Sequence, residues 1–271
     1  MGGRRSSLIP FGTSSRLRAE ILDVLSLSLL GLVFFMLVMI GAFAVRNAAG
    51  FGAVLIAMPM LAFVLPISTA VSVTTALTAI TSVHQVNRDW RRVAWRHFAI
   101  MAFYSAIGIS SGFYFIKILD ERTLRHSLGV FLILYSIYAI ATAKASRTVS
   151  ARWRGPLAAG TGIAGGLLGT LFGAGVGPIY VVYFNSLRME REIFRVTMST
   201  VVLLGGAARI AGYASLGFYE YSSIALIAIG LPLVFVGSWL GDKVIRRLDP
   251  QRFSWLVGGL ILLSGVALLV K

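Results

Sequence analysis

The chain contains no cysteine, only three histidines and only ten acidic residues among 271. The absence of cysteine excludes disulfides, thiolate metal ligands and a thiol nucleophile. Charged residues make up 13% of the chain, well below the roughly 25% of an average soluble domain. Hydrophobic residues make up 57%, and apolar runs recur from residue 24 to residue 270. These proportions indicate a polytopic membrane protein with essentially no soluble domain.

Carboxylates are missing from the middle of the apolar runs. Proton relays and cation sites inside membranes usually place a carboxylate there. The sequence therefore disfavours a cation transporter or a carboxylate-driven pump and accommodates an anionic substrate more easily. Eight of the ten acidic residues stand at segment ends or in loops: Asp23, Asp89, Asp120, Glu190, Glu192, Glu220, Asp242 and Asp249.

Signatures of enzymes are also absent. The sequence has no HExxH, no Walker A loop and no metal-ligand cluster. The stretch "GISSG" (108–112) matches the letters of G-x-S-x-G, but that motif requires a strand–turn–helix context. Inside an apolar segment, small residues instead pack helices together. We therefore expect a protein that is not an enzyme and that uses no cofactor and no metal.

The formal net charge is +15, which on its own would suggest a nucleic-acid partner. The basic residues, however, fall in short clusters between apolar runs, as the positive-inside rule produces at helix ends. We expect a small anionic substrate and the lipid bilayer as partners, with no nucleic acid. The predicted location is the inner membrane, with multiple passes, and a homodimer remains open.

Ten apolar segments are predicted as membrane segments of an all-α protein. The interval 24–66 is too long for one pass and fits two passes joined by a break at Arg46–Gly52. We expect an amino-terminal arm (1–23), a first repeat (24–143), a cytoplasmic linker (144–155) and a second repeat (156–271). The segments lie near 24–45, 52–66, 70–87, 98–117, 124–143, 156–172, 176–187, 195–213, 222–243 and 252–270.

Loop charges predict that the two repeats of five segments are inserted in opposite directions. The loops 88–97 and 144–154 are rich in arginine, which is typical of the cytoplasmic side. The loop 214–222 has no Lys or Arg and is expected on the other side. Five is an odd number, so the halves form an inverted repeat, as in many secondary transporters. The basic arm conflicts with ten passes, which place both termini outside.

Glycines interrupt both repeats at corresponding positions. The stretch "GFGAVLIAMPML" (50–61) pairs with "GAGVGPIYVVYF" (173–184), and "VTTAL" (73–77) pairs with "MSTVV" (198–202). A helix that begins inside the membrane points its free N–H groups and positive dipole end into the protein, which suits an anion. Half-helices starting near Val54 and Val176 would supply such ends. Helix packing is the alternative, above all for Gly165 and Gly169.

The candidate substrate-binding residues are these glycine breaks and the polar side chains near them. Arg46 and Arg209 each either bind the anion or serve a structural role, which for Arg46 means extending to the surface. Polar residues at 74, 78, 81 and 85 share one helical face and either line a path or bond neighbouring helices. The predicted contacts are Arg46, Asn47, Gly50, Phe51, Gly52, Thr74, Thr78, Gly173, Gly175, Gly177, Tyr180, Ser199, Thr200 and Arg209.

Two long stretches together resemble one transporter family. "AGFGAVLIAMPMLAFVLP", the polar "STAVSVTTALTAITS" and the basic "NRDWRRVAWR" resemble the first half of the sulfite exporter TauE/SafE family. "GGLLGTLFGAGVGPIYVVYFNSLRMEREIFRVTMST" resembles its second half, including the Gly-x-Gly-x-Gly-Pro run at 173–178 and the pair Phe194–Arg195. The resemblance covers residues 45 to 270. The first motif departs from the commoner glycine triplet, because it reads Gly50-Phe51-Gly52-Ala53-Val54.

The resemblance implies a permease, often for sulfur-containing anions such as sulfite and sulfonates. We therefore expect a secondary transporter that moves such an anion by alternating access, with one repeat moving against the other. Two alternatives stay open at this point. One is a transporter of another small metabolite such as a carboxylate, and the other is a membrane scaffold that transports nothing.

Overall fold

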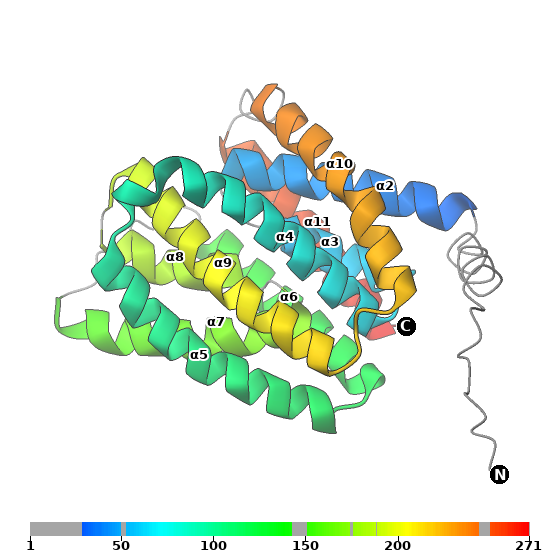
Figure 1. Cartoon of the computed structure of the whole chain (residues 1–271), viewed down its shortest axis with the longest axis horizontal. Coiled ribbons are helices and arrows are strands. Elements are labelled where there is room, and N and C mark those ends of the chain that lie inside the picture. The colour runs from blue at the N-terminus through cyan, green and yellow to red at the C-terminus, as the bar shows by residue number, and fades with distance from the viewer. Residues whose placement is uncertain are drawn as a thin grey trace, which may run out of the picture.

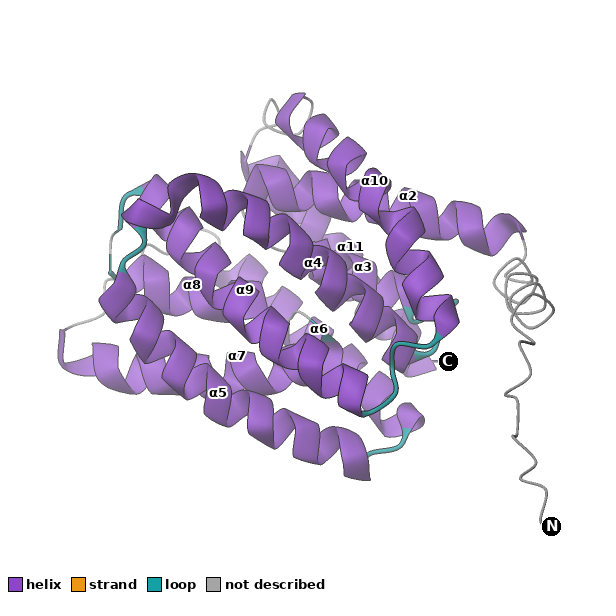
Figure 2. Ribbon diagram, in the orientation of Figure 1, coloured by secondary structure: helices purple, strands orange, loops and turns teal. Residues whose placement is uncertain are grey.

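The computed structural model describes residues 29–49, 53–142, 151–173, 176–187, 189–243 and 250–270. Every regular element in these ranges is helical (Figure 2), so the predicted all-α class is confirmed. Each of the ten predicted segments corresponds to one α-helix. The elements are α2 (Leu29–Ala49), α3 (Ala53–Leu61), α4 (Ile67–Asp89), η1 (Trp90–Arg92), α5 (Trp95–Ile118), α6 (Glu121–Thr142), η2 (Ala151–Trp153), α7 (Arg154–Phe172), α8 (Val176–Ser186), α9 (Arg191–Ser215), α10 (Tyr221–Lys243) and α11 (Pro250–Val270).

Five of the described helices are long and apolar enough to cross a membrane: α4, α5, α7, α9 and α10. The helices α3 and α8 have only nine and eleven residues. At 1.5 Å per residue they reach about 14 and 17 Å, roughly half of the hydrocarbon thickness. The predicted segment 52–66 is longer than α3, because the residue before Pro66 is disfavoured in a helix and residues 62–65 form a turn.

Two helix pairs from opposite halves of the chain run antiparallel. α4 packs beside α9 (Figure 1), where Gln85 meets Ser199 and Ala79 meets Gly206. α6 packs against α11, where Ser136 donates to the carbonyl oxygen of Gly258 at 2.7 Å. The contacts pair late residues of one helix with early residues of the other. The third and fifth helices of each half therefore meet their counterparts head to tail.

Two further pairs run parallel and depend on glycine for close packing. α5 packs against α7, and α10 packs against α2. A Cβ at Gly108 or Gly112 of α5 would overlap atoms of α7, and one at Gly237 or Gly241 of α10 would overlap backbone of α2. The same four-residue spacing thus serves both pairs. "GISSG" is a packing surface, as its place in an apolar segment indicated.

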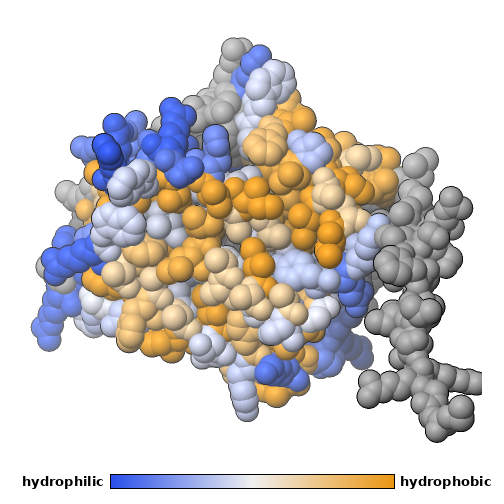
Figure 3. All heavy atoms as spheres, viewed as in Figure 1, coloured by the Kyte–Doolittle hydropathy of each residue, from blue (hydrophilic) through white to orange (hydrophobic). Residues whose placement is uncertain are grey.

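The surface between the helix ends is apolar. Figure 3 shows hydrophobic residues over the middle of α4 and α9, with hydrophilic residues gathered where α4 meets η1. Large apolar side chains are exposed on several helices, among them Phe103, Leu134, Phe235 and Trp239. An exposed apolar belt of this kind fits contact with lipid.

The beginning of α6 is fixed against the beginning of α4. The carboxylate of Asp120 accepts hydrogen bonds from the hydroxyl of Thr123 at 2.6 Å and from its backbone N–H at 3.3 Å, as a helix N-cap does. These bonds from Thr123 hold the pKa of Asp120 below its ordinary value. The next residue, Glu121, accepts a hydrogen bond from the backbone N–H of Ile67 at 3.4 Å.

Candidate functional site

Both predicted breaks lie between a long helix and a short one. α2 ends at Ala49 and α3 begins at Ala53, while α7 ends at Phe172 and α8 begins at Val176. Every residue of α3 except Met60 is buried, so this short helix lies in the protein interior. The predicted residues Gly50, Phe51, Gly52 and Gly175 lie outside the described residues, as does the side chain of Asn47.

The break after α7 is held by hydroxyl-bearing residues of α4. Gly173 has a φ of +79°, a left-handed conformation that favours glycine. The hydroxyl of Thr75 donates to the carbonyl oxygen of Gly173 at 3.2 Å. A Cβ at Gly173 would lie 3.1 Å from Thr74 Oγ1 and 3.3 Å from Val71 Cα. The break of the second half therefore contacts α4 next to its polar residues at 74, 78, 81 and 85, which we call the polar stripe.

Arg46, at the end of α2, points inward to that same stripe. Its guanidinium donates to Thr81 Oγ1, to Ser82 Oγ at 2.9 Å and to the carbonyl oxygen of Thr78 at 3.5 Å. It also lies 5.7 Å from the ring centroid of Phe43. Its hydrogen bonds thus link the end of α2 to α4, while the residue stays partly exposed.

Arg209, which lies six residues before the end of α9, is in a different position. Its side chain is 2% exposed, and its Nε and Nη1 atoms have no hydrogen-bond partner in the described structure. Neither ion pair found among the described residues involves it. Burying two guanidinium nitrogens without partners is costly, because their lost hydration is not replaced. The position therefore suits an anionic ligand.

The register of α4 and α9 sets the level of residue 209 along α4, while its guanidinium lies beside Gly205, where a Cβ would be 3.6 Å from Nη1, from Nη2 and from Ile109 Cδ1 of α5. Gly206 faces Ala79, and the helices run antiparallel, so one turn further along α9 corresponds to one turn back along α4. Arg209 is consequently level with Thr75, the residue that holds Gly173. The hydroxyl of Thr78, one turn from Thr75, is also buried and without a partner among the residues described.

Two tyrosines complete the surroundings of Arg209. Tyr213 follows Arg209 by one turn of α9, and Tyr180 bonds α5 one turn before Ile109. The Tyr180 hydroxyl shares a hydrogen bond with Ser105 Oγ at 2.6 Å, and Tyr213 donates to the carbonyl oxygen of Thr170 at 2.6 Å. These bonds tie α8 to α5 and α9 to α7. Arg209 therefore lies between α9 and α5, the two helices that these bonds fasten to α7 and α8.

The remaining predicted residues are placed less centrally. Ser199 donates to Gln85 at 2.7 Å and Thr200 to the carbonyl oxygen of Val196 at 2.8 Å. Ser199 precedes Arg209 by ten positions on α9, or about 15 Å at 1.5 Å per residue. Gly177 is buried in the first turn of α8.

The structure thus brings together part of the predicted set and adds residues that the sequence reasoning missed. Thr74 and Thr78 lie on α4 and Gly173 packs against this helix, while Arg209 and Tyr180 lie on the side of α5; Ser199 and Thr200 lie nearer the end at loop 88–97. The missed residues are Thr75, Ser105 and Tyr213. Two of them carried a signal, because Thr75 adjoins Thr74 and Tyr213 follows Arg209 by four positions, one helical turn.

Comparison with known proteins identifies the family of the chain. A family model described as sulfite exporter TauE/SafE matches residues 33–268. The chain belongs to that family. It is a membrane transporter by that membership, and the resemblance seen in the glycine motifs is confirmed. The chain is also 23% identical over 181 residues to the probable inner membrane transporter protein TsaS of Comamonas testosteroni, covering 66% of this chain and 74% of that protein. No solved structure matches it significantly.

Proposed function

We propose that this protein is a secondary transporter of a small anion, with sulfite, a sulfonate or a related sulfur-containing organic anion as the substrate class. The observation that carries the proposal is the buried guanidinium of Arg209, whose Nε and Nη1 atoms have no partner. An oxyanion bound there would replace the missing hydrogen bonds and neutralise the charge. Planar guanidinium groups present parallel N–H donors that fit two oxygens of one anion.

Neighbouring groups extend the site. The unpartnered hydroxyl of Thr78 supplies a further donor on the α4 side. α8 begins at Val176 after a glycine break, and its first N–H groups together with its dipole favour negative charge. The hydroxyls of Tyr180 and Ser105 share one hydrogen bond and add polar groups on α8 and α5. A site of donors without a carboxylate partner discriminates against cations.

We infer an inverted repeat from the directions of the helices. If the second half is the first half turned over, equivalent helices that meet at the pseudo-twofold axis must be antiparallel. The pairs α4–α9 and α6–α11 are antiparallel. The contact of α5 with α7 then has its equivalent in that of α10 with α2. Alternating access would follow from movement of one half against the other around Arg209.

The inner membrane is the location that we assign, in line with the name of the relative from Comamonas testosteroni and with the helices long enough to span a membrane.

A carboxylate is the alternative substrate, since it fits the same guanidinium. The experiment is counterflow in proteoliposomes with labelled sulfite, methanesulfonate, sulfate and acetate. We expect sulfite or methanesulfonate to exchange and acetate to compete weakly. Preferred exchange of acetate would assign the carboxylate instead. Flux of a cation or neutral solute without competition by anions would exclude the proposal, and absence of any flux would favour a scaffold.

A further inference from the structure

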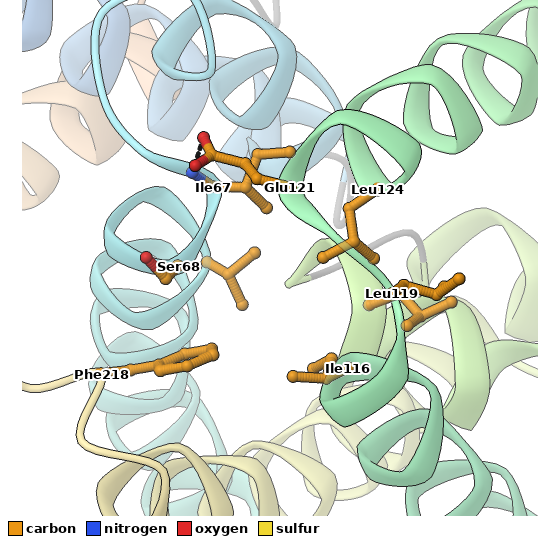
Figure 4. Close-up of a pocket in the computed structure, with 9 residues that line it drawn as sticks. Ile67, Ser68, Ile116, Leu119, Glu121, Leu124 and Phe218 are labelled. Atoms are coloured by element: carbon orange, nitrogen blue, oxygen red, sulfur yellow. Dashed lines mark hydrogen bonds between the residues drawn. The ribbon is translucent and has the colours of Figure 1, made fainter.

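A cavity of about 170 Å³ lies at the start of α4, away from the basic loop 88–97. Its walls come from α4, from the end of α5, from the start of α6 and from the segment before α10. Figure 4 shows Ser68 and Phe218 on one side of the open space and Ile116, Leu119 and Leu124 on the other. Val71 and Leu171 line it as well.

Three residues at the inner end of this cavity connect it to Tyr213 and to Gly173. The ring of Phe218 stacks on the ring of Tyr213, with centroids 5.6 Å apart and planes at 12°, and Arg209 lies one helical turn before Tyr213. Val71 lies against Gly173, and Leu171 precedes Gly173 by two residues. The inner end of the cavity is therefore the outer side of the break that Thr75 holds.

We propose that this cavity is the vestibule through which the anion reaches Arg209 from the side opposite loop 88–97. Val71, Leu171 and Phe218 form its floor and separate it from the buried guanidinium in this conformation. The proposal rests on the proposed function, because it assigns the access route to the site at Arg209. By the charges of the loops, this route opens away from the cytoplasm.

The carboxylate at the rim does not oppose an anion. Glu121 Oε1 accepts a hydrogen bond from Arg125 at 3.0 Å and one from the backbone N–H of Ile67 at 3.4 Å (Figure 4). Pro66, which precedes α4, provides no side-chain cap, so Glu121 satisfies one of the free N–H groups of α4 from outside. Arg125 offsets the charge of Glu121, and the carboxylate fastens α6 to α4 across the rim.

The absence of cysteine permits a direct test with single cysteines. Ser68→Cys places a thiol in the vestibule, and Ser215→Cys places one at the exposed end of α9, outside the cavity. Both variants are treated with a membrane-impermeant charged maleimide, whose thioether is stable to sulfite, and are washed before counterflow is measured. We expect both cysteines to react from the same side. The Ser68 adduct should lose at least about tenfold in flux, while the Ser215 adduct retains it.

A second measurement does not depend on flux. Thr74→Cys lies below the floor and should react slowly, and adding Leu171→Ala should raise its rate of labelling several-fold. The vestibule is overturned if Ser68→Cys stays unlabelled while Ser215→Cys reacts, if the Ser68 adduct transports like the control, or if Leu171→Ala leaves the labelling of Thr74→Cys unchanged. Failure of the proposed function would instead appear as missing anion exchange in unlabelled wild-type protein.

Discussion

The hydroxyl of Thr75 on α4 donates a hydrogen bond to the carbonyl oxygen of Gly173 at 3.2 Å. This bond joins the third helix of the first half to the break of the second half. The same helix accepts the guanidinium of Arg46 one to two turns further along, at Thr81 and Ser82. α4 therefore contacts residues next to both breaks, and a movement of α4 would displace both.

Gly173 should tolerate no side chain. Alanine in the left-handed region costs about 1–2 kcal/mol, and its Cβ would press on Thr74 Oγ1 at 3.1 Å. Gly217 is the matched control, because it has a φ of +76° and open space around its Cβ position. Gly217→Ala reports the backbone strain alone. We expect Gly173→Ala to lower the unfolding temperature further than Gly217→Ala and to reduce flux, whereas equal effects would mean that contact with α4 is unimportant.

Arg46 should contribute mainly to stability. Arg46→Gln removes charge-assisted hydrogen bonds to α4, and bonds to charged groups contribute about 1.5–3 kcal/mol each. Chemical unfolding in detergent should show a loss of this order, while Arg88→Gln, at an exposed position on α4, should change little. We expect the anion Kd to change by less than about threefold, well under 1.4 kcal/mol. A tenfold weaker Kd with unchanged stability would make Arg46 a ligand of the anion.

The close contact of α5 with α7 should depend on individual glycines. A Cβ at Gly166 of α7 would meet the backbone of α5, with Ile109 N at 2.9 Å, whereas a Cβ at Gly160 on the same helix has no atom within 4 Å. Gly166→Ala should destabilise by about 1–3 kcal/mol through overpacking. Gly160→Ala should be neutral or stabilising by up to about 1 kcal/mol, because alanine favours helix. Equal melting temperatures for the two variants would contradict this packing.

The positions of the helices could be predicted from the sequence because each apolar run is long and bounded by charges or glycines. Apolar runs and glycine breaks predict starts near Val54 and Val176, and α3 and α8 begin at Ala53 and Val176. The end of α3 was placed too late, since hydropathy continues to Pro66 while the backbone geometry imposed by proline does not permit helix there. Hydropathy reports burial in the membrane and not the conformation of a short linker.

The candidate site could be predicted only in outline. Arg46 and Arg209 look alike in the sequence, as single arginines at or within apolar runs. Their difference depends on which acceptors a neighbouring helix presents, and α4 presents Thr81 and Ser82 to Arg46. The register of α4 on α9 likewise decides that Thr75 is level with Arg209 while Ser199 lies about three turns away. Such contacts between distant segments cannot be predicted from the spacing of residues within one segment.

The central claim is that Arg209 binds the transported anion, and the most direct test is ligand-induced thermal stabilisation of wild type and Arg209→Met. At about one hundred times Kd, an anion that binds the native state stabilises it by about 2.7 kcal/mol. We predict this shift for wild type with sulfite or methanesulfonate. Arg209→Met should melt at the wild-type temperature or above, since no partner of the guanidinium nitrogens Nε and Nη1 is lost, and the anion should no longer stabilise it. An undiminished anion-induced shift in Arg209→Met would contradict the account.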